Sequence, residues 1–242
     1  MPRGRAPGYE LPRETILAKA AALFARNGYT ATSMNEVAEA CGVSKPALYH
    51  YVRDKHQLLV EIAEGHIARL LALVNATETG AQPAEPRLRA LIAAFLAVYA
   101  GSQNEHRVLT EDVKFMRVDE RKRVLHGQRR VVAAFADAVA AARPDLRGAG
   151  LDKPLAMLLF GMMNWMFTWL RPQGELTYAD MAPVVCDLFF SGLAGVRPPR
   201  SDSHHDNGDS PCLSAPKNSS KHSSRPASPR RPRSRPPTST SA

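Results

Sequence analysis

The sequence predicts an all-α fold of nine helices, and three observations lead to this prediction. Apolar residues recur at helical spacing in successive segments, beginning with the stripe of Ile16, Ala20, Leu23 and Phe24. Helix-capping patterns and stop glycines bound these segments. No run rich in Val, Ile and Thr alternates apolar with polar residues between turn residues, so strands are not expected.

The nine segments follow one another with short connections. The first helix is expected at residues 13–27, the second from Ser33 to Gly42, the third after Ser44, and the fourth from about residue 54 to residue 75. The other five are expected at residues 87–100, 105–116, 120–143, 153–171 and 178–195.

Local signals set several of these boundaries. Ser33 and Glu36 form the Ser-x-x-Glu capping box of the second helix. Ser44 can cap the third helix, and Pro46 is tolerated in its first turn because an N–H there has no helical partner.

The C-terminal segment differs in composition from the rest of the chain. From residue 197 onward, nine Lys or Arg stand against three Asp, so the segment carries +6 of the net charge of +9. It also holds nine of the 19 prolines, and such a composition cannot bury enough apolar area to offset chain entropy. We therefore expect residues 197–242 to form a disordered basic tail and residues 1–10 a flexible basic arm.

The totals exclude several classes of protein. Three widely separated cysteines without a CxxC pair indicate neither a disulfide framework nor a zinc site, which fits a reducing cytoplasm. The N-terminus lacks a signal-peptide core, and the most apolar stretch, residues 155–170, is too short for a membrane span. No GxSxG, GxxxxGK[ST], HExxH or GxGxxG motif occurs, so no catalytic residue, enzymatic activity or cofactor is expected.

Residues 28–59 carry the strongest functional signal. They hold two short helical segments separated by a Gly-Val-Ser turn. A second helix held at a steep angle by such a turn, with small and polar residues at its start, fits the major groove of double-stranded DNA. The pattern predicts a regulator of transcription. A non-specific architectural DNA binder, in which the basic tail dominates binding, is the alternative.

Residues 11–60 resemble the DNA-binding domain of the tetracycline-repressor (TetR) family of one-component regulators. The resemblance rests on IxxxAxxLFxxxGYxxTS at residues 16–33, NEVAEACGVS at 35–44 and LYHYVRDKHQLL at 48–59. It implies a helix-turn-helix domain over residues 11–56 and a helical ligand-binding and dimerisation domain over residues 57–196.

The resemblance also implies which side chains meet DNA. Those expected at base edges are Lys45, Pro46, Ala47 and Tyr49, and those expected at phosphates are Thr32, Ser33, Tyr49, Tyr51 and Lys55. His50 could serve either role, and Ser44 is also expected in the DNA-binding site. Val43 and Leu48 should instead be buried under the turn. The alternatives are ordinary packing for the two tyrosines and a solvated charge for Lys45.

A single short recognition helix reads few base pairs, so a homodimer on a palindromic operator is expected, with half-sites ~34 to 50 Å apart. The last two helices are the predicted dimer surface because they are apolar on every side. We expect an isologous four-helix bundle built from Leu155, Leu158, Leu159, Met162, Met166, Val184, Val185, Leu188, Phe189 and Leu193.

The segment GMMNWMFTWLRP, residues 161–172, indicates a pocket for a small-molecule effector, since adaptable thioethers beside rigid aromatics suit an apolar ligand. The predicted pocket residues are Phe95, Tyr99, Phe115, Met116, Phe135, Met162, Trp165, Met166 and Trp169. Plain core or dimer packing is the alternative for each of them. A metal site at Glu105, His106, Glu111 and Asp112 is disfavoured because these ligands lack a defined spacing, so no metal is expected.

The Asn-Trp and Trp-x-Arg-Pro elements are similar to regulators of fatty-acid, aromatic and steroid catabolism that respond to acyl- or aryl-coenzyme A thioesters. Such a ligand needs an apolar slot with a cationic mouth, and residues 105–130 are rich in Arg and Lys. A free apolar or aromatic compound that controls an efflux or detoxification gene is the alternative. In either case, ligand is expected to shift the population between two spacings of the recognition helices. Repression is the expected direction, although the sequence does not decide it.

Overall fold

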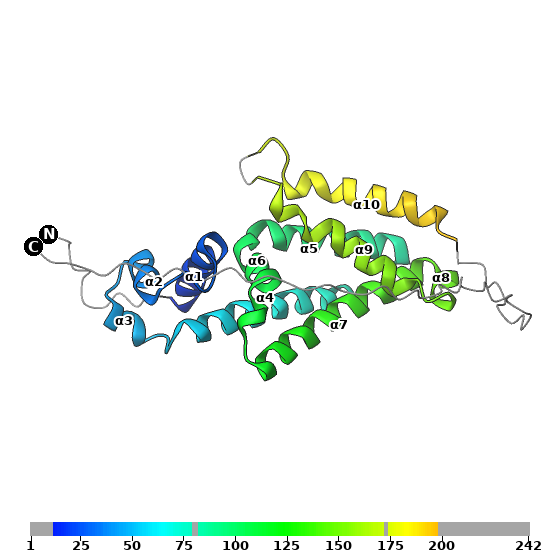
Figure 1. Ribbon diagram of the computed structural model, residues 1–242. Helices are drawn as coiled ribbons and strands as arrows, with labels where there is room; N and C mark the ends of the chain where they lie inside the picture. The colour runs from blue at the N-terminus through cyan, green and yellow to red at the C-terminus, as the bar shows by residue number, and fades with distance from the viewer. Residues whose placement is uncertain (1–11, 79–81, 172–173, 198–242) are drawn as a thin grey trace, which may run out of the picture. The chain divides into compact units, whose positions relative to one another are not determined.

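The structure is a computed structural model that describes residues 12–78, 82–171 and 174–197 (Figure 1). These residues form ten α-helices and two 3-10 turns without a strand, so the all-α prediction is confirmed. The helices are α1 (Arg13–Asn27), α2 (Met34–Cys41), α3 (Lys45–Tyr49), α4 (Lys55–Glu78), α5 (Ala84–Gly101), α6 (Gln103–Glu111), α7 (Val118–Ala142), α8 (Pro144–Gly148), α9 (Asp152–Asn164) and α10 (Tyr178–Gly195). The expected basic arm and all of the expected tail except Arg197 lie outside the described residues.

The predicted count of nine helices was one too low. The additional helix, α8, has five residues, and a single buried side chain, Leu146, anchors it. Such a segment is too short to show a helical period in the sequence.

Two predicted helices also ended too late. The helix predicted at residues 105–116 is α6 and ends at Glu111, and the helix predicted at residues 153–171 is α9 and ends at Asn164; each continues as a 3-10 turn, Val113–Phe115 and Met166–Thr168. Met163, Met166 and Leu170 are buried on both sides of the second break. The apolar spacing therefore continued through the turn and concealed the end of the helix.

The N-terminal helices α1 to α3 bury apolar side chains together. The predicted stripe on α1 is buried, and it belongs with Val37 on α2 and Leu48 on α3 to the apolar cluster that continues into the larger bundle. Gly28 ends α1 with a φ of 84°. The capping box at the start of α2 forms as predicted: Glu36 N donates to Ser33 Oγ at 3.3 Å, and Ser33 N donates to the Glu36 carboxylate at 2.7 Å.

The long helix α4 leads from these three helices into a larger bundle with α5, α6, α7, α9 and α10 (Figure 1). An aromatic cluster holds the middle of that bundle, where Phe135 lies 4.8 Å from Phe95 and 4.6 Å from Phe160 between ring centroids. Gly127 lets α7 approach α4 closely, since a Cβ there would lie 2.8 Å from Ile67 Cγ1. No helix in the described ranges is long and apolar enough to cross a membrane.

Candidate DNA interface and ligand cavity

The turn between α2 and α3 is built from local hydrogen bonds. Gly42 adopts the left-handed conformation, with φ 67° and ψ 31°, and Val43 N reaches back to Ala38 O at 3.0 Å. Ser44 Oγ accepts a bond from Ala47 N at 3.3 Å and so caps α3. Leu48 is fully buried beneath the turn. The hydrogen bonds of the turn, the Ser44 cap and the buried Leu48 side chain therefore set the orientation of α3.

The outer face of α3 presents the residues predicted to read bases. Lys45, Pro46 and His50 are exposed, Tyr49 is 44% exposed, and Ala47 is half-buried. Among the described residues, neither Lys45 nor His50 has a side-chain hydrogen bond or an ion pair. These side chains are free to meet a groove edge.

The residues predicted to hold phosphates are placed differently. Thr32 is only 1% exposed, and its hydroxyl donates to Gly28 O at 2.9 Å. Ser33 and Ser44 use their oxygens as helix caps, but each hydroxyl hydrogen remains available to a phosphate. Tyr51 is half-buried.

Lys55 serves the fold of this half. Its ammonium group donates to the carbonyl oxygens of Tyr29, Thr30 and Thr32 at 2.7, 3.1 and 2.6 Å. It also lies 4.6 Å from the centre of the Tyr29 ring. All three hydrogens of the ammonium group are thus occupied, and the start of α4 is tied to the loop before α2. Phosphate contacts by Thr32 and Lys55 stay predictions that these partners do not favour.

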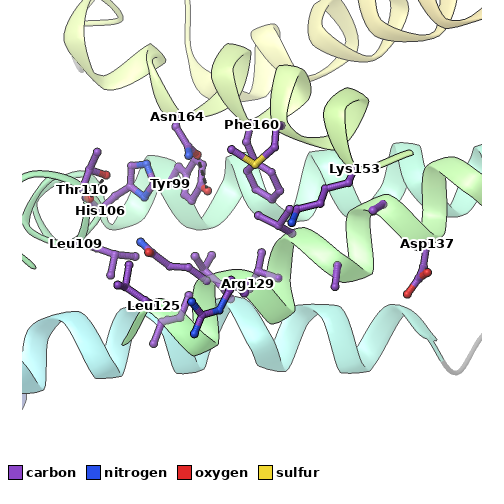
Figure 2. Close-up of a pocket in the computed structure, with 18 of the residues that line it drawn as sticks. Tyr99, His106, Leu109, Thr110, Leu125, Arg129, Asp137, Lys153, Phe160 and Asn164 are labelled. Carbon is purple, nitrogen blue, oxygen red and sulfur yellow. Dashed lines mark hydrogen bonds between the residues drawn. The ribbon is translucent and has the colours of Figure 1, made fainter. Parts of the chain in front are cut away.

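A cavity of about 630 Å³ lies in the larger bundle (Figure 2). Helices α4, α5, α6, α7 and α9 all contribute to its wall. Apolar side chains make up most of that wall: Ile67, Leu70, Leu109, Leu125, Val131, Val132, Met157 and Phe160. Leu125 and Met157 are exposed and mark the side that opens to solvent, between α7 and α9.

Polar groups gather at one end of the cavity, where Figure 2 shows Tyr99, His106 and Asn164 together. The Tyr99 hydroxyl donates to Asn164 Oδ1 at 2.9 Å. The His106 ring stacks on Tyr99 with 4.0 Å between centroids, and its Nδ1 lies 3.3 Å from Nε2 of His66. The other nitrogen of His106, Nε2, is buried and has no partner among the described residues.

Burial keeps this end of the cavity uncharged. It lowers the pKa of His66 to about 3, with smaller contributions from His106 and Arg69, and it lowers the pKa of His106 to about 4. Burial also raises the pKa of Tyr99 above its ordinary value. All three side chains are therefore neutral near pH 7.

The open side of the cavity carries charge. Arg129 and Lys153 line it, are exposed, and have no ion-pair partner within the described ranges. The two acids there, Asp137 and Asp152, both face Arg147 instead: Asp137 in a short ion pair and Asp152 at 3.8 Å. Unpaired positive charge thus remains beside the opening.

Of the nine predicted pocket residues, the structure brings only Tyr99 to the cavity wall. Phe95 and Phe135 pack in the core behind it. Met116 and Met166 are buried elsewhere, and Met162 is half-buried outside the wall. Trp165 and Trp169 are 64% and 51% exposed, because the buried side of that segment is formed by Met163, Met166 and Leu170. Eight of the nine residues therefore lie outside the wall of this cavity, and their contact with a ligand stays a prediction.

The sequence offered a signal for the residues that were missed. His66 lies on the buried stripe of α4 with Ile62, Ala63 and Leu70, and His106 lies on that of α6 with Leu109. A histidine inside an apolar stripe indicates a buried polar site. Across the described residues, no group of three or more His, Cys, Asp or Glu is placed to hold a metal ion.

The residues predicted to form the dimer surface divide between an exposed face and the core of the bundle. Three of the ten predicted members are exposed: Leu158 on α9 and Val184 and Leu188 on α10. Trp165, which was not among the ten, directly follows α9 and is also exposed. The other predicted members, Leu155, Leu159, Met166, Val185, Phe189 and Leu193, are buried in the bundle itself, and Met162 is half-buried.

Two of the contacts that join the DNA-binding half to the cavity-bearing helices involve α6 and α7. The Phe115 ring, just after α6, stacks on Tyr29 at 5.4 Å. At the start of α4, His56 Nε2 lies 2.7 Å from the carboxylate of Glu120 on α7. These pairs place α7 and the 3-10 turn after α6 in direct contact with residues of the DNA-binding half.

Comparison with known protein families gives two matches. Residues 16–62 match a family model described as bacterial regulatory proteins of the tetR family, and residues 81–193 match one described as the tetracyclin repressor-like C-terminal domain. The crystal structure of a TetR-family regulator from Bordetella parapertussis is 34% identical, with a TM-score of 0.72, and the similarity covers 78% of this chain and 99% of that one.

Three further relatives differ in how much they cover. The activator FasR of Mycolicibacterium smegmatis is 30% identical over 45% of this chain, which is about half, 52%, of its own length. The repressor KstR2 of Mycobacterium tuberculosis is 27% identical over 75% of this chain and 92% of that protein. The structure of AibR in complex with isovaleryl coenzyme A and operator DNA is 26% identical, with a TM-score of 0.63, over 73% and 96% of the two chains.

Proposed function

Because the chain belongs to the TetR family of bacterial transcriptional regulators, we propose that it is a homodimeric repressor that an acyl- or aryl-coenzyme A thioester releases from its operator. It is a DNA-binding regulator and not an enzyme. The proposal adds three points: the class of effector, the dimer and the direction of regulation.

The cavity carries the proposal on the effector. It combines an apolar wall, one neutral polar end and an open side with the unpaired cations Arg129 and Lys153. An acyl group would be buried along the wall, while the phosphates of coenzyme A would remain outside beside the cations. The AibR complex supports this class, since that relative was crystallised with isovaleryl coenzyme A.

The exposed face of α9 and α10 supports the dimer. Large apolar side chains such as Leu158, Trp165 and Leu188 rarely gather in the open on a monomer, and a second copy would cover them. Two copies of α3 would then read half-sites of a palindrome, with Lys45, Tyr49 and His50 at the bases.

Ligand would act by changing the spacing of the two recognition helices. His106 on α6 and Ile67 on α4 both line the cavity, so an occupant alters how these helices pack. The Phe115–Tyr29 stack and the His56–Glu120 pair would pass that change to the DNA-binding half. Release by ~100-fold needs about 2.7 kcal/mol of differential affinity.

Selection and titration test the proposal. The full chain is used to select its operator from random duplexes, and the complex is then titrated with isovaleryl-, octanoyl- and phenylacetyl-coenzyme A while DNA release is followed by fluorescence anisotropy. Free coenzyme A and free octanoate are the controls. Release by a thioester but by neither control is expected. Release only by compounds without coenzyme A would replace this proposal with control of efflux or detoxification.

A further inference from the structure

The position of the ring proton on His106 follows from its neighbours. Arg69 Nη2 lies 3.4 Å from Nδ1 of His66, and since a guanidinium group can only donate, that nitrogen is the acceptor. The ring proton of neutral His66 is therefore on Nε2, which lies 3.3 Å from Nδ1 of His106 and donates to it. His106 must then carry its own proton on Nε2.

This N–H group is a buried donor without an acceptor. His106 is only 4% exposed and lines the cavity, and its Nε2 has no partner within the described part of the chain. Tyr99, whose ring stacks on it, already donates to Asn164. Leaving a buried donor unmatched is costly, so the site is built to receive an acceptor from outside the chain.

The surroundings restrict what that acceptor can be. The wall beside His106 includes Tyr99, Leu109, Thr110 and Asn164, and none of these side chains is a cation. Arg69 reaches only the far side of His66. A carboxylate there would lose its hydration without a compensating charge, whereas a neutral carbonyl oxygen would need just one donor.

We propose that His106 Nε2–H donates to a neutral carbonyl oxygen of the effector and so makes the cavity select thioesters and ketones over carbonyl-free analogues. His66 and Arg69 act as positioning residues that hold the ring in the donating tautomer. The thioester part rests on the function proposed above, while the selection for a carbonyl does not.

A matched ligand pair tests this on the unaltered protein. Octanoyl-coenzyme A and its S-octyl thioether differ only in a carbonyl replaced by a methylene group. Calorimetry on the full chain should give roughly ten-fold tighter binding of the thioester, as expected for one net hydrogen bond. Equal affinities would overturn the proposal and indicate that a buried water satisfies His106 in both complexes.

Variants locate the effect. In His106→Phe the preference for the thioester should disappear, and in His106→Gln, which restores an N–H donor, part of it should return. Thr110→Val is the matched control, since Thr110 lines the cavity but its hydroxyl donates to the backbone oxygen of His106. A thioester preference that survives in a folded His106→Phe protein would overturn the assignment.

A second ligand separates this proposal from the function proposed above. The infrared carbonyl band of bound 13C-labelled 2-decanone should lie at lower wavenumber in the wild type than in His106→Phe. If neither coenzyme A ligand binds while the ketone shows this shift, the effector class is wrong and the donor assignment stands. If the thioester binds and the ketone band is the same in both proteins, the effector class stands and the donor assignment is wrong.

Discussion

The DNA-binding half and the cavity differ in whether their polar side chains find hydrogen-bond partners within the protein. In the DNA-binding half, Thr32, Ser33, Ser44 and Lys55 all use their polar atoms to satisfy the backbone. In the cavity, a relay of two buried histidines ends in an N–H without an acceptor. In the first region these side chains are satisfied within the protein, while Lys45 and His50 stay exposed for DNA. The second keeps a buried donor without an acceptor among the described residues, and the proposed effector would supply that acceptor.

Replacing Lys55 should show how far the DNA-binding half depends on its internal bonds. Lys55→Met leaves three carbonyl oxygens without their charged donor. We expect a loss of about 2–3 kcal/mol in the free energy of unfolding, measured by urea denaturation, together with loss of operator binding. Lys19→Met on the exposed face of α1 is the control and should change neither. An unchanged stability in Lys55→Met, with weaker DNA binding alone, would restore the phosphate role.

Much of the first region could be read from local sequence, because a capping box, a left-handed glycine and a buried leucine act within a few residues. The residues that line the cavity could not be predicted from local sequence. Trp165 and Trp169, one helical turn apart, looked like a pocket wall, yet the neighbouring methionines face the core and leave the tryptophans outside. Which face is buried depends on how distant helices pack, and Gly127, which brings α7 against α4, carries no visible pattern.

Lowering the pH should reduce the free energy of unfolding mainly through the two buried histidines at the cavity, and less through the DNA-binding half. The folded-state pKa values of His66 and His106, about 3 and about 4, lie below the unfolded value of 6.5. Between pH 6.5 and these values the unfolded chain binds protons that the folded chain does not, so stability falls as pH falls. From pH 7.5 to 5.5 we expect a loss on the order of 2 kcal/mol from the pair.

Urea denaturation at fixed protein concentration measures this loss. His106→Phe should make the decrease about half as steep, while Thr110→Val should leave it as in the wild type. A stability that does not change over this range would mean that the two rings are solvated in the folded protein.

Gly127→Ala should disturb the contact between the two helices that frame the cavity. Its Cβ would meet Ile67, a branched side chain with little freedom on a helix. We expect a loss of about 1–3 kcal/mol in the free energy of unfolding and weaker ligand binding, both measured on the purified protein. Gly65→Ala on the exposed side of α4 is the control because a Cβ there meets nothing within 4 Å. Equal losses in the free energy of unfolding for the two substitutions would exclude the close approach of α7 to α4 at Gly127.

The smallest effect on stability is expected at Lys45, and it gives the sharpest comparison between the regions. Lys45→Ala removes an exposed cation without a partner, so the melting temperature should stay the same. Operator affinity should fall by about 1–3 kcal/mol, whereas affinity for octanoyl-coenzyme A should not change.

Lys153→Ala is the mirror experiment, since that lysine lies at the opening of the cavity. It should weaken thioester binding and leave operator affinity without ligand unaltered. The salt dependence then assigns the role of Lys45: a shallower slope with unchanged base preference means a phosphate contact, and a relaxed preference at one position means base reading. If Lys45→Ala weakened the binding of operator DNA and of octanoyl-coenzyme A equally, the two regions would not act separately. The contrast drawn between them would then be wrong.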